Sequence, residues 1–157
     1  MTEGVACPWR VRDTARMRAW QATITPVLTV ASGTAAVRFY ERAFGAREVW
    51  RTTSPNGRIV AELAIADARL RVADEAPEAG NRGPRSLGGT AVRINLFVGD
   101  PDAIAARAIA AGAREIAPVA DQPYGLRQGR LEDPFGHQWL IGRPLLDDAG
   151  DWARPGR

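Results

Sequence analysis

Two side chains of this 157-residue chain could transfer a proton: His137, the only histidine, and Glu62, a carboxylate in a predicted strand. An unperturbed imidazole titrates near pH 6.5, and a carboxylate whose pKa is raised by burial can act as a general base. Each residue also has a structural interpretation. Glu62 can pair with Arg58 or Arg71, and the ring of His137 can bond to the backbone of the preceding turn. We therefore place catalysis by Glu62 and His137 second, after the binding of a small molecule.

A larger set of side chains suits binding of a small molecule. Aromatic walls with a few fixed polar groups are typical of small-ligand sites. Between residues 121 and 129, polar side chains and an aromatic ring crowd a glycine-containing loop. Arginines would suit an anionic or carbonyl-bearing ligand through charge-assisted hydrogen bonds. The predicted ligand-binding residues are Trp50, Arg71, Asn95, Phe97, Gln122, Tyr124 and Arg127.

The elements that would position these residues are predicted from local patterns. Residues 129–132 and 137–141 are short strands joined by the four-residue turn Asp-Pro-Phe-Gly at 133–136. Pro134 presets φ for this turn, and Gly136 can take a positive φ. The stretch is therefore predicted to be a β-hairpin.

The same order of elements occurs twice along the chain. The first half predicts strands at 23–30, 48–53, 58–65 and 69–72 and a helix at 34–44, and the second half a strand at 91–98 and a helix at 101–111 ahead of the hairpin. The letters GAREV at 45–49 recur as GAREI at 112–116. One βαβββ unit leaves a sheet face uncovered, which a second unit can cover. The sequence thus predicts an α+β fold of two tandem βαβββ modules.

The chain length suits one domain with an apolar core. We expect an N-terminal extension (1–21), a domain at 22–145 and a C-terminal tail (146–157). Within the domain the modules span about 22–73 and 91–143, and the Gly/Pro/Arg-rich segment 74–90 links them.

Composition argues against several partners. All 21 basic residues are arginines scattered among 18 acids, unlike a phosphate-binding stripe, so no nucleic acid is expected. No stretch approaches the ~18 apolar residues of a membrane span. Cys7 is the only cysteine, which suits a reducing cytoplasm. We expect a cytoplasmic protein that does not bind membranes.

The run from Asp121 to Trp139 (DQPYGLRQGRLEDPFGHQW) closely resembles the PhnB-like branch of the vicinal oxygen chelate superfamily. That superfamily also contains glyoxalases, extradiol dioxygenases, and fosfomycin and bleomycin resistance proteins. The resemblance extends over roughly residues 22–145. It implies a cupped, roughly eight-stranded mixed sheet around a cleft, usually within a homodimer. Glu62 matches the pattern of the branch, whereas Asn95 replaces a frequent histidine.

The resemblance also implies where a divalent metal would be held. Superfamily enzymes generally bind it with His, Gln or Glu side chains from the first and last strands of each module. The corresponding residues here are Thr25, Arg71, Arg93 and Leu140. Threonine is a weak ligand, arginine adds positive charge, and leucine cannot ligate. We therefore expect no metal and no other cofactor, and a divalent metal at other positions stays open as an alternative.

Three functions follow from these observations. The first is a metal-independent small-molecule-binding protein, similar to the dimeric resistance proteins that sequester a drug or metabolite in the cleft. The second is a glyoxalase-like lyase or isomerase, or another superfamily enzyme. The third is a non-enzymatic interaction module whose dimer surface is the functional part.

Overall fold

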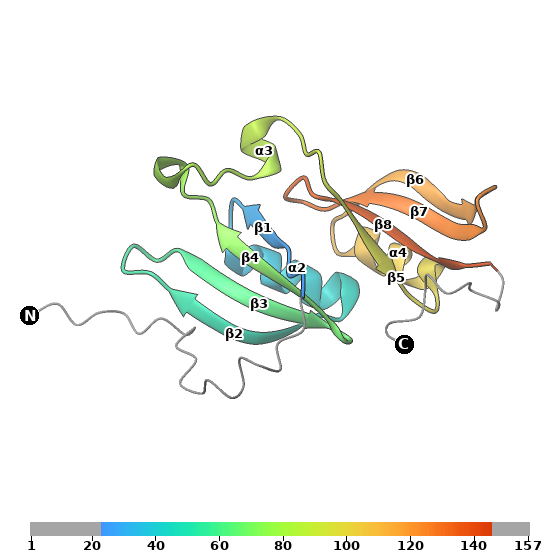
Figure 1. The fold of residues 1–157 in the computed structure, drawn as a ribbon, viewed down its shortest axis with the longest axis horizontal. Coiled ribbons are helices and arrows are strands. Elements are labelled where there is room, and N and C mark those ends of the chain that lie inside the picture. Colours follow the sequence, from blue (N-terminus) through green and yellow to red (C-terminus); the bar gives the residue numbers. More distant parts are fainter. Residues whose placement is uncertain (1–22, 146–157) are drawn as a thin grey trace, which may run out of the picture.

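The computed structural model describes residues 23–145, which fold into two modules with the same order of elements (Figure 1). The first module comprises β1 (Val27–Val30), α2 (Gly33–Phe44), β2 (Arg47–Thr53), β3 (Ile59–Ile65) and β4 (Ala68–Asp74). The second comprises β5 (Arg93–Phe97), α4 (Pro101–Ala110), β6 (Arg114–Asp121), β7 (Leu126–Glu132) and β8 (Gln138–Pro144). The predicted pair of βαβββ modules is confirmed. The expected N-terminal extension and C-terminal tail lie outside the described residues.

Each module forms its own four-stranded mixed sheet. The strand orders are β1-β4-β3-β2 and β5-β8-β7-β6. β1 runs parallel to β4 and β5 parallel to β8, while the other neighbours are antiparallel. The eight predicted strands thus divide into two hydrogen-bonded sheets, which lie side by side in Figure 1.

The two long helices begin and end at the residues that their sequences favour. The Ser32 hydroxyl accepts a hydrogen bond from Ala35 N (3.3 Å) at the start of α2, and Gly45 ends the helix with φ 68°. Asp100 caps α4 through Ala103 N at 3.0 Å. Capped ends satisfy backbone groups that a helix otherwise leaves without partners.

One apolar core joins the modules. α2 packs against α4, and the buried rings of Tyr40 and Phe44 in α2 contact Trp139 in β8, with centroids 5.5 Å and 4.6 Å apart. Arg107 of α4 also donates from Nε to the carbonyl oxygen of Ala43 (2.9 Å). The two modules therefore share a hydrophobic interior and form one domain.

The segment between the modules contains two short helical turns, η1 (Pro77–Ala79) and α3 (Pro84–Leu87). The sequence suggested only an aperiodic linker there. Pro84 is buried, and a Cβ atom added at Gly136 would lie 2.9 Å from its ring. α3 therefore packs directly on the turn between β7 and β8.

Each sheet has one face that neither long helix covers, because successive side chains of a strand point to opposite faces. α2 and α4 lie behind the sheets in Figure 1, against the side of Leu63 in the first sheet and of Leu131 and Trp139 in the second. We call the opposite sides the helix-free faces. The first carries Trp50, Glu62, Arg69 and Arg71, and the second carries Arg93, Asn95, Phe97, Gln128, Arg130, Gln138 and Leu140.

Candidate functional site

The first helix-free face holds an ion pair beside an indole ring. Arg71 of β4 donates from Nε to Glu62 Oε2 of β3 at 3.0 Å, and Arg69 lies 3.9 Å from the other carboxylate oxygen. The Arg71 guanidinium carbon lies 5.5 Å from the ring centroid of Trp50, within the range of cation–π attraction. Glu62 thus has an arginine partner, as its structural interpretation expected, and that partner is Arg71 and not Arg58.

The second helix-free face holds a chain of polar side chains. The Tyr124 hydroxyl donates to Gln128 Oε1 (3.2 Å), and Gln128 Nε2 donates to Asn95 Oδ1 (3.4 Å). Gln122 Nε2 donates to the carbonyl oxygen of Gln128 (3.2 Å). Phe97 lies in the same cross-strand row as Gln128 and is 47% exposed. The structure therefore gathers four predicted binding residues, Asn95, Phe97, Gln122 and Tyr124, around Gln128.

Arg127 lies apart from this group. It shares a face of β7 with Leu131, and its guanidinium bonds to Asp102 of α4 (2.7 and 2.6 Å) and to Asp121 of β6 (2.8 Å). The hydrogen bonds from Arg127 hold the pKa of Asp102 below its ordinary value. The structure thus places Arg127 on the helix side of the sheet, away from the predicted site.

His137 bonds to the other module. Its Nε2 lies 2.9 Å from the carbonyl oxygen of Thr29 in β1, so the ring contacts strand backbone and not the backbone of the turn. His137 also lines a groove of about 430 Å³ together with residues of β1 and α3, residues 89–92 and Ile94. Glu62 and His137 have separate partners, which gives no support to a joint catalytic role.

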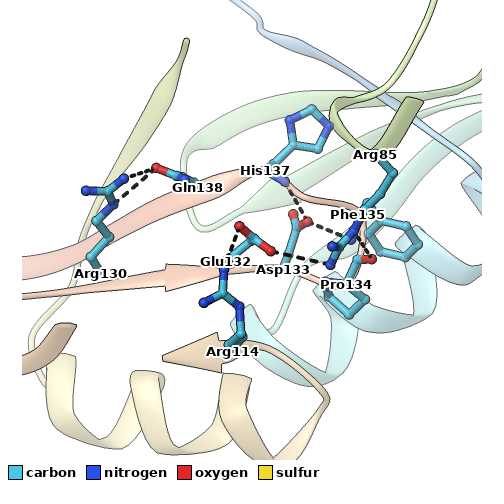
Figure 2. Close-up of polar contacts among 9 residues, drawn as sticks. All are labelled: Arg85, Arg114, Arg130, Glu132, Asp133, Pro134, Phe135, His137 and Gln138. Atoms are coloured by element: carbon cyan, nitrogen blue, oxygen red, sulfur yellow. Dashed lines mark hydrogen bonds and ion pairs between the residues drawn. The ribbon is translucent and has the colours of Figure 1, made fainter. Parts of the chain in front are cut away.

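Asp133, the first residue of the turn, is the centre of a buried hydrogen-bond network, of which Figure 2 shows the two bonds to the backbone of the turn. Its Oδ1 accepts from the backbone N–H groups of Phe135 (2.9 Å) and His137 (3.0 Å). Its Oδ2 accepts from the Tyr40 hydroxyl (2.6 Å) and Trp139 Nε1 (3.0 Å). Burial, followed by the charge of Asp133, raises the pKa of Tyr40 well above its ordinary value. This carboxylate therefore fixes the turn and ties the second module to α2.

Two further interactions flank the turn in Figure 2. Glu132 accepts from Arg114 Nη2 (3.1 Å) and lies 3.4 Å from Arg85 Nη2 of α3. Arg130 donates from Nε to Gln138 Oε1 at 3.1 Å, and its Nη2 contacts the same oxygen. Neither Arg130 nor Gln138 was among the predicted site residues. Strand alternation against Leu131 and Trp139 is the sequence signal that places both on the helix-free face.

The positions that the resemblance assigns to metal ligands do not fit a metal site. The strand register pairs Val27 with Arg71 in the first sheet and Asn95 with Leu140 in the second, so Arg71 and Leu140 occupy equivalent positions. Arg71 is engaged by Glu62, and Leu140 has no ligating atom. Within residues 23–145, no group of three His, Cys, Asp or Glu side chains is arranged to hold a metal ion.

In each module the first strand runs parallel to the last, a helix lies behind the sheet, and the opposite face is polar and aromatic. This combination defines a class of α+β proteins. The sequence model of the glyoxalase/bleomycin resistance protein/dioxygenase superfamily matches residues 22–141. The chain belongs to this superfamily. None of the helices in the described part is long and apolar enough to span a membrane.

Several individual proteins and solved structures are similar to this chain. Uncharacterized proteins of Mycobacterium tuberculosis (strain H37Rv) and Mycobacterium bovis are 39% identical over 131 residues, which cover 81% of this chain and 77% and 86% of theirs. The crystal structure of TioX from Micromonospora sp. ML1 has a TM-score of 0.62 at 28% identity and covers 79% of this chain and all of its own. The fosfomycin resistance protein FosX of Listeria monocytogenes shares the fold, with a TM-score of 0.65 at 15% identity over 82% of this chain and 98% of its own.

Proposed function

We propose that the protein binds a small molecule on its helix-free faces without a bound metal. The observation that supports this best is the ordered polar chain from Tyr124 through Gln128 to Asn95, next to the exposed ring of Phe97. Small-ligand sites combine aromatic surface with a few fixed polar groups in this way. The ion pair of Glu62 and Arg71 beside Trp50 provides a similar surface on the first sheet.

The proposal extends to the physiological role. The run 121–139 resembles the PhnB-like branch, whose superfamily also contains dimeric resistance proteins that sequester a drug. We therefore propose that the ligand is a drug or metabolite, that the protein sequesters it in the cytoplasm, and that antibiotic resistance is one consequence.

The proposed assembly is a homodimer, in which a second copy would cover exposed apolar side chains such as Val49 (40%). Light scattering after gel filtration is expected to give twice the chain mass of 17.0 kDa. A mass equal to one chain at micromolar concentration would remove the dimer from the proposal and leave the binding site to a single chain.

Purified protein is expected to contain no stoichiometric metal and to show no change in melting temperature when Zn²⁺, Ni²⁺, Mn²⁺ or Fe²⁺ is added. An ion that binds only the native state stabilises it by mass action, so binding at a hundred-fold excess over Kd would add about 2.7 kcal/mol. Elemental analysis and thermal unfolding before and after chelator treatment measure both quantities. A metal-dependent rise of several degrees contradicts the metal-independent proposal.

The Glu62→Gln variant separates binding from catalysis. The amide oxygen can still accept from Arg71, so we expect the free energy of unfolding to change by no more than about 1 kcal/mol and ligand binding to persist. Compounds that raise the melting temperature of the wild type should do the same for the variant. These compounds should be recovered unchanged after incubation, as judged by mass spectrometry. Conversion of a compound by the wild type that stops in the variant would establish an enzyme with Glu62 as its base.

A further inference from the structure

The second helix-free face contains a guanidinium that no carboxylate within residues 23–145 neutralises. Arg130 is half-buried in the middle of β7, and its Nε and Nη2 both contact a single oxygen, Oε1 of Gln138. A guanidinium carries about five N–H donors, so most of its donor capacity is unused there. Arg71 and Arg127, the two arginines that the sequence suggested for an anion, differ from Arg130 because both have carboxylate partners. Arg71 pairs with Glu62, and Arg127 pairs with two aspartates.

The nearest acid on the same strand face is already engaged. Glu132 follows Arg130 by two residues, and its carboxylate is held by Arg114 (3.1 Å) and Arg85 (3.4 Å). Figure 2 shows Arg85 on the side of the turn and Arg114 beside Glu132, while Arg130 extends away from both toward Gln138. Glu132 therefore serves the contact with α3 and leaves the charge of Arg130 in place.

The neighbouring amides are oriented so that they also present donors. A guanidinium can only donate, so Gln138 must turn its oxygen toward Arg130, which leaves its NH₂ group for other acceptors. Gln128 accepts from Tyr124 and donates to Asn95 Oδ1, so Asn95 likewise presents its NH₂ group. The guanidinium fixes the orientation of Gln138.

These donors surround one apolar side chain. The register places Asn95 and Arg130 on either side of Leu140, and Arg93 beside Gln138. Arg93 is exposed and adds a second positive charge. We call Arg93, Asn95, Arg130 and Gln138, with Leu140 between them, the oxyanion patch. The patch combines two cations and two amides with an apolar floor, at the position where the family resemblance would have placed an acidic metal ligand.

We infer that the oxyanion patch binds a carboxylate or phosphonate group of the small molecule, while Leu140 and Phe97 contact its apolar part. Charge-assisted hydrogen bonds from a guanidinium to an oxyanion are about twice as strong as neutral ones. The inference rests on the proposed function, because it names the ligand class of the same site. Arg130 is the residue whose charge provides this selectivity.

The test compares benzoate with benzamide, which share a ring and differ in charge, by isothermal titration at low ionic strength. The wild type should bind benzoate roughly ten-fold more tightly than benzamide, as expected for one charge-assisted contact. Arg130→Gln should abolish this ratio. Arg130→Lys should keep only part of it, because an ammonium lacks the planar fork of the guanidinium. Tighter binding of phenylphosphonate than of benzoate would identify a phosphonate-like ligand, and the reverse a carboxylate.

Arg143→Gln is the matched control. Arg143 lies on the same strand as Gln138 but on the face of Trp139 and Ile141, so the variant loses the same unit charge outside the patch. It should retain the full benzoate preference. An equal loss in Arg143→Gln and Arg130→Gln would show a general charge effect and overturn the patch. Equal binding of benzoate and benzamide would also overturn it while leaving small-molecule binding intact. The patch would also be overturned if ligands from a wider compound screen bound Arg130→Gln as tightly as they bind the wild type.

Discussion

Replacing Asp133 by alanine is expected to lower the free energy of unfolding by about 3–5 kcal/mol. The side chain is 1% exposed and accepts four hydrogen bonds, two from backbone N–H groups of the turn and two from the side chains of Tyr40 and Trp139. Alanine removes all four acceptor contacts and leaves buried donors without partners. A buried donor without a partner costs more free energy than a satisfied hydrogen bond contributes to stability.

Urea denaturation followed by tryptophan fluorescence measures this loss. Asp133→Asn should lose less than Asp133→Ala, because one amide oxygen still accepts, but its NH₂ group faces donors. Asp67→Ala, in an exposed turn of the first module, is the matched control and should stay within about 0.5 kcal/mol of the wild type. A loss below about 1 kcal/mol for Asp133→Ala would show that the turn forms without this carboxylate.

The Tyr40→Phe variant is expected to lose about 1–3 kcal/mol at neutral pH, because it deletes the hydroxyl that donates to Asp133 at 2.6 Å. The ring itself stays, so its contacts with Phe44 and Trp139 are preserved. The same equilibrium denaturation experiment gives the value. A loss as large as that of Asp133→Ala would mean that ring packing changes as well.

The stability difference between these two proteins should depend on pH. The folded protein holds the proton of Tyr40 more tightly than the unfolded chain, whose tyrosine titrates near pH 10. The stabilisation is therefore complete below pH 10 and is lost as the pH rises toward the folded pKa, because only the unfolded chain releases the proton. Above pH 10 the wild type should lose about 1.4 kcal/mol per pH unit relative to Tyr40→Phe. Parallel stability curves between pH 8 and 11 would contradict this.

The fold could be predicted because its signals are local. The repeated GAREV and GAREI letters, the alternating strands and the Asp-Pro-Phe-Gly turn each specify structure within about ten residues, and the two modules follow from them. The positive φ predicted for Gly136 is confirmed at 91°.

The partners of individual side chains were harder to predict because they come from distant segments. Nothing near Asp133 indicates that the hydroxyl of Tyr40 is its partner. Arg127 was selected as a binding residue because the start of its strand was placed at Gly129. β7 in fact begins at Leu126, and continuing the alternation from Leu131 puts Arg127 on the helix side and Arg130 on the helix-free face. The alternation of side chains along the strand could therefore have predicted which face carries each arginine. The pairing of Arg127 with Asp102 could be seen only in the folded structure.

The hydrogen bond between Tyr40 and Asp133 joins residues that are 93 positions apart. On the ribosome, the strands and helix of the first module are complete once Asp74 has been synthesised, yet Tyr40 and Phe44 still lack the surface that buries them. At about 5–20 residues per second, the hairpin that carries Trp139 follows several seconds later. During that interval the nascent chain exposes an aromatic surface of the kind that chaperones bind, so the first module reaches its final packing only when nearly all of the domain has been made.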